Sequence, residues 1–256
     1  MSMNYLRQWL DAGGSLEQLE DENQLEFQPS LADLEEKLKN LDPQEYAKTR
    51  NHINGAVSRL SPYLRHGVIA SLDLLNRVHV DHPAHWQGKF FQEVIWREYF
   101  HKIADQFPDL IWEDAEAYKT GFEASDYFEH LPAEITEART GCALIDQIIE
   151  QLLSTGYLHN RCRLYLASYV VHFKRVRWQA GAKWMLGHLI DGDIASNNLS
   201  WQWVASTFSA KPYLFNLASA NSFFDEKWNL EPGANQEINH DFATLERLLF
   251  SKTENL

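Results

Sequence analysis

The 256-residue chain is predicted to be an all-α protein. Glycine and proline are sparse, with 12 and 8 residues, so few positions are forced out of helical geometry. Apolar residues recur at helical spacing along most of the chain, and no run alternates β-branched and polar residues as a half-buried strand would. A hydrophobic content of 45% is enough for a core of its own. Together these features favour a helical fold over any class that contains a sheet.

The first half of the chain begins with an acidic segment. The first 45 residues carry 11 Asp or Glu and three Lys or Arg, and residues 1–45 are expected to form a helical cap packed on the main body. Helices are expected at 31–40, 45–50, 61–77 and 87–106. Pro108, Gly121 and Pro132 then interrupt the pattern, so residues 108–140 should consist of loops and short pieces.

The second half contains the clearest amphipathic helix, at 141–155. Its apolar residues recur at i, i+1, i+4, i+5, i+8 and i+9, which places them on one side. Thr140 is the expected N-cap, and Gly156 is the expected stop. The segment 160–173 is apolar on most sides and should be a helix buried in the middle of the domain. Further helices are expected at 179–190 and 196–207.

Composition restricts the partners and the location. A net charge of -13 opposes long-range attraction to nucleic acid and to anionic membranes. No stretch reaches the roughly 18 to 20 apolar residues of a membrane span, and the start MSMNYLRQWLDAGG does not resemble a secretory signal. We therefore expect a soluble, cytoplasmic protein. Cys142 and Cys162 lack the spacing of a zinc or redox motif and should be buried apolar residues.

One stretch reverses the sign of the charge. Between residues 159 and 183 there are six basic residues and no acid. This stretch is either a solvated helix end or a surface that binds a polyanion such as DNA. The candidate DNA-binding residues are Arg161, Lys174, Arg175 and Arg177.

Two patterns have some likeness to metal sites, but we expect no metal. The H-x-x-H-x-x-H string at 79–85 is interrupted by Pro83, which breaks the helix that would align the imidazoles. The D-G-D motif at 191–193 could open a calcium loop, but Gln202 stands at the twelfth position, where a Glu is needed.

Two expected helices carry side chains that suit chemistry. Glu93, Trp96 and Arg97 share one helix face at about 100° per residue, although taken alone they also describe a routine Glu–Arg pair beside a packed tryptophan. Trp201 and Trp203 point about 200° apart on a helix, so one should face inward and the other outward. The polar cluster just before them is larger than capping needs and indicates a ligand. It consists of Asp191, Asp193, Asn197 and Asn198.

Four long segments become specific when they are taken together. They are SRLSPYLRHG (58–67), FFQEVIWREYF (90–100), TGCALIDQIIEQLLSTGYLHNRCR (140–163) and LIDGDIASNNLSWQWVAST (189–207). In this order they resemble the FAD-binding helical domain of the DNA photolyase and cryptochrome family, and above all the bacterial class I cyclobutane pyrimidine dimer photolyases. The resemblance covers about residues 46–216. It implies a multi-helix FAD-binding domain at 46–256, in which a folded-back FAD lies over a cavity for a flipped-out lesion.

The resemblance also implies roles for individual residues. The implied FAD-binding residues are Tyr46, Ser58, Arg59, Leu60, Ser61, Arg97, Asn160, Arg163, Asp191, Asp193 and Asn197. Arg163 and Asp191 would pair beside the flavin ring, and Asn197 would lie near flavin N5. The implied lesion-binding and catalytic residues are Glu93, Trp96, Asn160 and Trp203. In an electron-transfer chain, Trp201 would be the proximal tryptophan and Trp178 the middle one.

The sequence departs from the family in four places. The N-terminal antenna domain is absent, so no antenna chromophore is expected. Val57 and Leu164 replace a usual threonine and a usual methionine. The terminal tryptophan of the electron-transfer chain has no match, because its region reads EASDYFEHL and offers only Tyr127 or Phe128.

Three functions are compatible with these residues. The first is FAD-dependent, blue-light-driven repair of pyrimidine dimers in DNA, a carbon–carbon lyase reaction. The second is a cryptochrome-like light sensor without repair activity, and the third is a helical interaction protein that has lost FAD. The set Glu93, Trp96 and Trp203 favours repair, because a sensor needs no lesion pocket. The sequence leaves open the oligomeric state and the preference for single- or double-stranded DNA.

Overall fold

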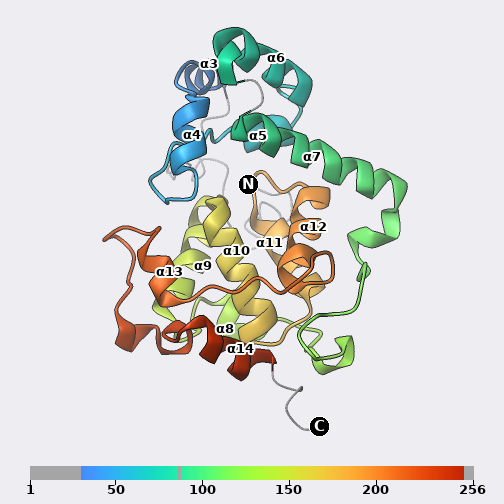
Figure 1. Cartoon of the computed structure of the whole chain (residues 1–256), viewed down its shortest axis with the longest axis vertical. Coiled ribbons are helices and arrows are strands. Elements are labelled where there is room, and N and C mark those ends of the chain that lie inside the picture. Colours follow the sequence, from blue (N-terminus) through green and yellow to red (C-terminus); the bar gives the residue numbers. More distant parts are fainter. Residues whose placement is uncertain (1–29, 86–87, 251–256) are drawn as a thin grey trace, which may run out of the picture.

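The computed structural model describes residues 30–85 and 88–250 and consists of helices joined by loops (Figure 1). Within these ranges the only β-type pairing is an isolated bridge between Phe128 and Val176. The predicted all-α class is therefore confirmed for the described part of the chain. The acidic cap predicted for 1–45 lies outside the described residues up to residue 29.

Over residues 30–85 and 88–106, the first part of the fold contains five helices of four residues or more. They are α3 (Leu31–Lys39), α4 (Pro43–Thr49), α5 (Ser61–Arg65), α6 (Ser71–Asp81) and α7 (Lys89–Gln106). Ser30 caps α3 by accepting a hydrogen bond from the Asp33 amide, and Asp42 caps α4 in the same way. The single helix predicted over 61–77 is wrong, because the chain turns between α5 and α6, where Gly67 has a left-handed φ of 69°.

The second part contains the longer run of helices. They are α8 (Ala133–Thr136), α9 (Ala143–Thr155), α10 (Asn160–Ser168), α11 (Trp178–His188), α12 (Ile194–Ala205), α13 (Leu217–Asn221) and α14 (Phe242–Phe250). A π-helical turn at Tyr169–Phe173 extends α10. Short 3-10 turns lie at Pro83–His85, Pro108–Ile111, Ala124–Asp126, Pro232–Ala234 and Gln236–Ile238. The irregular segment expected at 108–140 is confirmed.

Both ends of α9 test the capping prediction. Gly156 ends the helix in the left-handed conformation, with φ 66°, as predicted. The N-cap is Cys142 rather than Thr140, so that prediction is wrong. The Thr140 hydroxyl donates instead to Asp146 in the first turn of α9, and so ties the loop to the helix without capping it.

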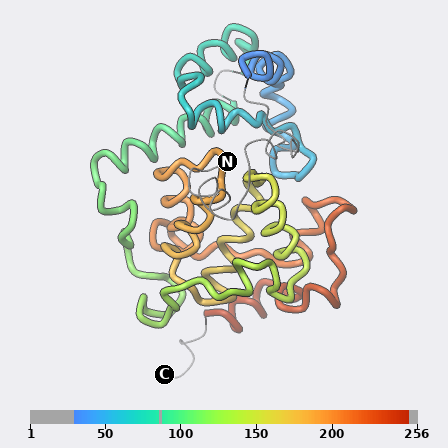
Figure 2. Tube along the Cα trace, turned by 180° about the vertical axis from the view of Figure 1, so that it is seen from behind, coloured from blue at the N-terminus to red at the C-terminus, as the bar shows by residue number. Residues whose placement is uncertain are grey.

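Two hydrophobic cores divide the described chain. The smaller core joins α3, α5, α6 and α7, and includes Leu34, Leu60, Leu74 and Phe91. The larger core is formed by residues from 118 to 238, with α9 to α12 at its centre. Figures 1 and 2 show α3 to α6 gathered at one end and α9 to α14 at the other. Within the described residues, α3 shares its core with α7, and the predicted boundary at residue 45 stays a prediction.

No helix in the described ranges is both long and apolar enough to cross a lipid bilayer. The cytoplasmic location expected from the sequence stays a prediction.

Candidate functional site

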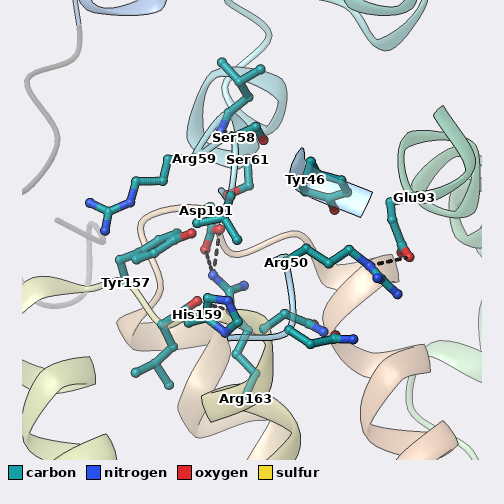
Figure 3. A pocket seen from close by; sticks show the side chains of 15 residues that line it. Tyr46, Arg50, Ser58, Arg59, Ser61, Glu93, Tyr157, His159, Arg163 and Asp191 are labelled. Carbon is teal, nitrogen blue, oxygen red and sulfur yellow. Dashed lines mark hydrogen bonds and ion pairs between the residues drawn. The ribbon is translucent and has the colours of Figure 1, made fainter. Parts of the chain in front are cut away.

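A cleft lies between the two parts of the fold. It contains a cavity of about 300 Å³, within the usual range of ligand sites (Figure 3). One wall comes from α4 and the turn before α5, and the other comes from the start of α10 and the turn before α12. The lining residues are Tyr46, Arg50, Asn51, Val57, Ser58, Arg59, Leu60, Ser61, Glu93, Tyr157, Leu158, His159, Asn160, Arg163 and Asp191.

An ion pair stands between this cavity and a second one. The Arg163 guanidinium donates to both carboxylate oxygens of Asp191, at 2.7 and 3.0 Å, so the predicted pair is present (Figure 3). Asp191 is buried, and Arg163 is further fixed by a bond from Nε to the Leu158 carbonyl. Asn160, Arg163 and Asp191 also line a smaller cavity of about 150 Å³, so the two cavities are adjacent.

The start of α10 positions two of these residues. His159 caps the helix, because its Nδ1 accepts a hydrogen bond from the Arg161 amide at 3.0 Å. Burial lowers the pKa of His159 to about 4, so the ring is neutral at pH 7 and can act as this acceptor. Asn160 begins the helix, and Arg163 follows one turn later on the same side.

The start of α12 is anchored by Asp193. Its carboxylate caps the helix through the Ser196 amide and accepts from Arg97 at 3.1 Å and from His101 at 2.7 Å. Burial alone would raise the pKa of Asp193, but the Ser196 hydrogen bonds and the neighbouring cations outweigh burial and lower it. Arg97 is thus a link between α7 and α12, and it lines neither of the two cavities.

The turn before α5 presents hydroxyl and amide groups to the larger cavity. Arg59 has a left-handed φ of 52°, which is uncommon for a residue with a side chain. Leu60 is buried in the smaller core and so fixes the turn, while Ser58 and Ser61 line the cavity. Hydroxyl and amide groups at a helix start suit an anionic group such as a diphosphate.

Glu93 and Tyr46 complete this wall. The Glu93 carboxylate pairs with Lys89 at 2.8 Å and with Arg50 at 3.6 Å. Tyr46 packs edge-on against Phe90, with ring centroids 5.3 Å apart. Burial, with a further contribution from Glu93, raises the pKa of Tyr46. All these side chains are therefore held by neighbours from α4 and α7.

The tryptophans divide as the helical spacing predicts. Trp201 is 2% exposed and lines the smaller cavity, whereas Trp203 is 42% exposed. Trp203 lies beside Tyr213, with ring centroids 5.5 Å apart. Trp96 is 46% exposed on α7. Neither Trp96 nor Trp203 lines either cavity, so their part in a lesion pocket stays a prediction.

The structure also fixes the surroundings of Trp178 and Asn197, two further predicted site residues. Trp178, the first residue of α11, is fully buried, and Trp201 packs against the same helix. Asn197 lines the smaller cavity, and its side-chain amide donates to the Ala182 carbonyl and to the Asn198 side chain. Its predicted placement near flavin N5 stays a prediction.

The basic stretch does not form a surface of one sign. Lys174 pairs with Glu134 at 3.2 Å and Glu237 at 3.1 Å, and Arg177 pairs with Glu129 at 3.4 Å. The sequence could not show this, because all three acids come from outside the stretch. Arg175 stacks on Phe122 and Arg161 on Phe223, with guanidinium carbons 3.6 and 3.8 Å from the ring centroids. These four residues remain DNA-binding candidates only as a prediction.

Sequence reasoning missed several residues of the cleft. Tyr157 is buried, and its ring lies 5.6 Å from the Arg163 guanidinium and 5.9 Å from that of Arg59. Arg50 and His159 also line the larger cavity. The adjacency of Tyr157 and His159 to Asn160 in YLHN was an available signal. Val57 and Leu164, noted as departures, line the larger and the smaller cavity respectively.

The donor set fits a flavin dinucleotide. Guanidinium and hydroxyl groups line the larger cavity and suit a diphosphate. Met185, Leu189 and Trp201 give the smaller cavity apolar walls that suit an aromatic ring. The fold and the cleft thus define a helical flavin-binding protein.

Comparison with known proteins identifies the family. Residues 90–230 match the family described as the FAD binding domain of DNA photolyase, and the chain belongs to this family. A deoxyribodipyrimidine photo-lyase of Streptomyces griseus is 33% identical over 152 residues, which cover 59% of this chain and 32% of the relative. The Escherichia coli deoxyribodipyrimidine photo-lyase is 32% identical over 187 residues, with 66% and 38% covered.

Solved structures agree on the fold. A bacterial class III photolyase of Agrobacterium tumefaciens superposes with a TM-score of 0.65 at 25% identity, over 82% of this chain and 45% of the photolyase. An archaeal photolyase of Sulfolobus tokodaii gives a TM-score of 0.63 at 23% identity, over 90% and 52%. The chain therefore spans about half or less of each of these relatives and structures.

Proposed function

We propose that this chain binds FAD in the two adjacent cavities and uses blue light to split cyclobutane pyrimidine dimers in DNA. The observation that carries the proposal is the ion pair of Arg163 with buried Asp191 between the cavities, with Glu93 on the wall of the larger one. Two photolyases aligned with this part of the chain support it, because both are named deoxyribodipyrimidine photo-lyases.

The cofactor is held by the residues of both walls. Ser58, Ser61 and the amides of their turn bind the diphosphate, and Tyr46, Arg59 and Leu60 shape that end of the site. Arg163 and Asp191 would hold the flavin ring from one side, and Asn197 would contact it from α12. Arg97 acts through Asp193, because it fixes the start of α12 rather than lining a cavity. When bound and reduced, FAD supplies the light-driven electron that opens the dimer and takes it back afterwards.

The lesion is bound at the open side of the cleft. The Glu93 carboxylate accepts hydrogen bonds from N–H groups of the bases, and Asn160, which is exposed at the start of α10, contacts both cofactor and lesion. Trp96 and Trp203 provide exposed aromatic faces on which a flipped base stacks, worth about 1 to 3 kcal/mol per base. Trp201 and Trp178 pass electrons to the oxidised cofactor and take no part in dimer splitting.

One experiment tests the proposal directly. The purified protein is loaded with FAD, photoreduced, and incubated under blue light with single-stranded and duplex DNA that contain dimers. Loss of dimers from either DNA is the expected result. Reversible photoreduction without loss of dimers would overturn repair and support a light sensor. A colourless protein that refuses added FAD would overturn the cofactor assignment as well.

A further inference from the structure

The buried Trp178 indole has a carboxylate as its hydrogen-bond partner. Its Nε1 donates to Asp114 Oδ1 at 2.5 Å. Trp178 is fully buried, and Asp114 lies in the loop that follows the 3-10 turn Pro108–Ile111. A short bond from a buried indole to a carboxylate joins a group that can be oxidised to a group that can accept a proton.

The surroundings leave the Asp114 charge without a cation. The same Oδ1 accepts a second hydrogen bond, from the Gln179 side-chain amide at 3.1 Å. Both donors are neutral, and in the described ranges no Lys, Arg or His forms an ion pair with Asp114. Asp114 is therefore placed to receive the indole proton through the hydrogen bond that already joins it to Trp178.

Trp178 lies on the helix that contacts Trp201. Gly181, three residues after Trp178 on α11, packs so closely against the Trp201 ring that an added Cβ would lie 2.3 Å from Cη2. Trp201 in turn lines the smaller cavity. Trp178 therefore stands about one helical turn along α11 from the point at which the Trp201 ring packs on that helix.

The nearby tyrosines have no comparable proton acceptor. Tyr118 and Tyr127 are buried and stacked, with ring centroids 4.3 Å apart, and burial raises the pKa of both. The Tyr127 hydroxyl is bonded to the Thr120 hydroxyl at 2.7 Å, and in the described part of the chain neither tyrosine hydroxyl is hydrogen-bonded to a carboxylate. A tyrosine is readily oxidised only when its proton can leave, so this pair is a poor end for the route.

We propose that Asp114 accepts the indole proton of Trp178 when Trp178 is oxidised. One electron passes from Trp178 to oxidised Trp201, whose own electron has gone to photoexcited, oxidised FAD. The N–H bond of Trp178 breaks, the proton moves to Asp114 Oδ1, and a neutral tryptophanyl radical beside a neutral carboxyl group remains. Return of the electron then requires return of the proton, so the charge separation lasts without a third tryptophan. The inference rests on the electron route in the proposed function.

The test uses the FAD-loaded full chain, without DNA, after a blue-light flash. Transient absorption separates cationic from neutral tryptophanyl radicals, and the wild type should form the neutral radical more slowly in D2O than in H2O. Asp114→Asn keeps the shape and the hydrogen-bond acceptor but lacks the base. We expect its neutral radical to form about a hundredfold more slowly, the low end for a positioned proton acceptor. Asp114→Glu should restore much of the rate, and Glu113→Gln in the same loop should leave it unchanged.

A second measurement needs no light. The ¹⁵N–¹H resonance of the Trp178 indole, assigned by its loss in Trp178→Phe, should lie at low field and move to high field in Asp114→Asn. The same spectrum shows whether the variant is folded. A neutral radical that forms at the wild-type rate in folded Asp114→Asn overturns the inference, and so does a wild type that forms no Trp178 radical. If the proton-coupled radical forms but no dimer is repaired, the inference stands and the proposed repair function fails.

Discussion

The Glu93 carboxylate, at the wall of the larger cavity, forms ion pairs with both Arg50 and Lys89. Glu93→Gln keeps the size of the side chain and removes its charge, so both cations lose a partner at a partly exposed position. We expect FAD to be retained and the yield of dimer repair to fall by about tenfold or more, as for a lost hydrogen bond to a charged group. Repair per absorbed photon is the measurement. Asp105→Asn, exposed near the other end of α7, is the control that should leave the yield unchanged.

Trp203 is the most direct test of the lesion pocket. Its ring is 42% exposed and lies beside Tyr213. Trp203→Ala should weaken binding of dimer-containing DNA by about 1 to 3 kcal/mol, the stacking energy of one base, while FAD absorbance is unchanged. Trp112→Ala removes another exposed indole, 39% exposed, and should leave affinity as it is. Release of FAD with unaltered affinity would place Trp203 on the cofactor side instead.

The candidate DNA-binding residues differ in whether an acidic neighbour already pairs with their charge. In the described ranges Arg161 pairs with no acid and is held by Phe223 and the Asn51 carbonyl, whereas Lys174 has two acidic partners. Arg161→Ala should reduce the salt dependence of DNA binding by about one unit of slope, and Lys174→Ala should change it little. Affinities measured at several salt concentrations check this. A larger effect at Lys174 would instead place the bound DNA at the far end of α10 and its π turn, roughly 20 Å along the helix axis from Arg161.

On the scale of helices, α11 and α12 pack closely where Gly181 of α11 meets the Trp201 ring of α12. An added Cβ at Gly181 would overlap the Trp201 ring, whereas Gly187 on the same helix has open space. Gly187→Ala should stabilise the protein by up to about 1 kcal/mol, because alanine favours the helix. Gly181→Ala should destabilise it and shift the flavin absorption bands, because the ring at the smaller cavity must move. Urea unfolding of both variants measures the difference, and equal stabilisation would show that Trp201 adjusts freely.

The elements also show what a sequence can and cannot predict. Apolar periodicity located α9 and α7 to within two residues, since a helix must bury one face. It joined α5 and α6 into one helix, because the hydrophobic pattern continues through the turn at Gly67. It missed α14, although Leu245 of that helix is buried. Nothing in the sequence indicated a role for Asp114, because its hydrogen-bond partner Trp178 is 64 residues away and only the fold brings the two together.

For the whole molecule, two buried histidines make the stability of the fold depend on pH. Burial lowers the pKa of His159 and His172 from 6.5 to about 4. Between these values the unfolded chain binds more protons at these two histidines than the folded one, so their contribution to stability falls as the pH drops from about 6.5 to about 4. Each histidine contributes up to about 3 kcal/mol over this window.

Urea unfolding at pH 7 and pH 5 checks this response. His159→Asn keeps an acceptor for the Arg161 amide and should remove roughly half of the pH dependence. Exposed His130→Gln is the control, and it should retain the full dependence. A dependence that survives His159→Asn intact would mean that the protonated ring is accommodated in the folded protein.

The division of the fold into two cores has a consequence for how the protein holds together. Each wall of the larger cavity belongs to a different core, so a ligand in the cleft touches both. By mass action, a ligand at a hundred times its dissociation constant adds about 2.7 kcal/mol to whatever it bridges. Without it, the smaller core should open first, in a separate unfolding step. With FAD bound, the two unfolding steps would merge into one, because the cofactor contacts both cores and couples their unfolding.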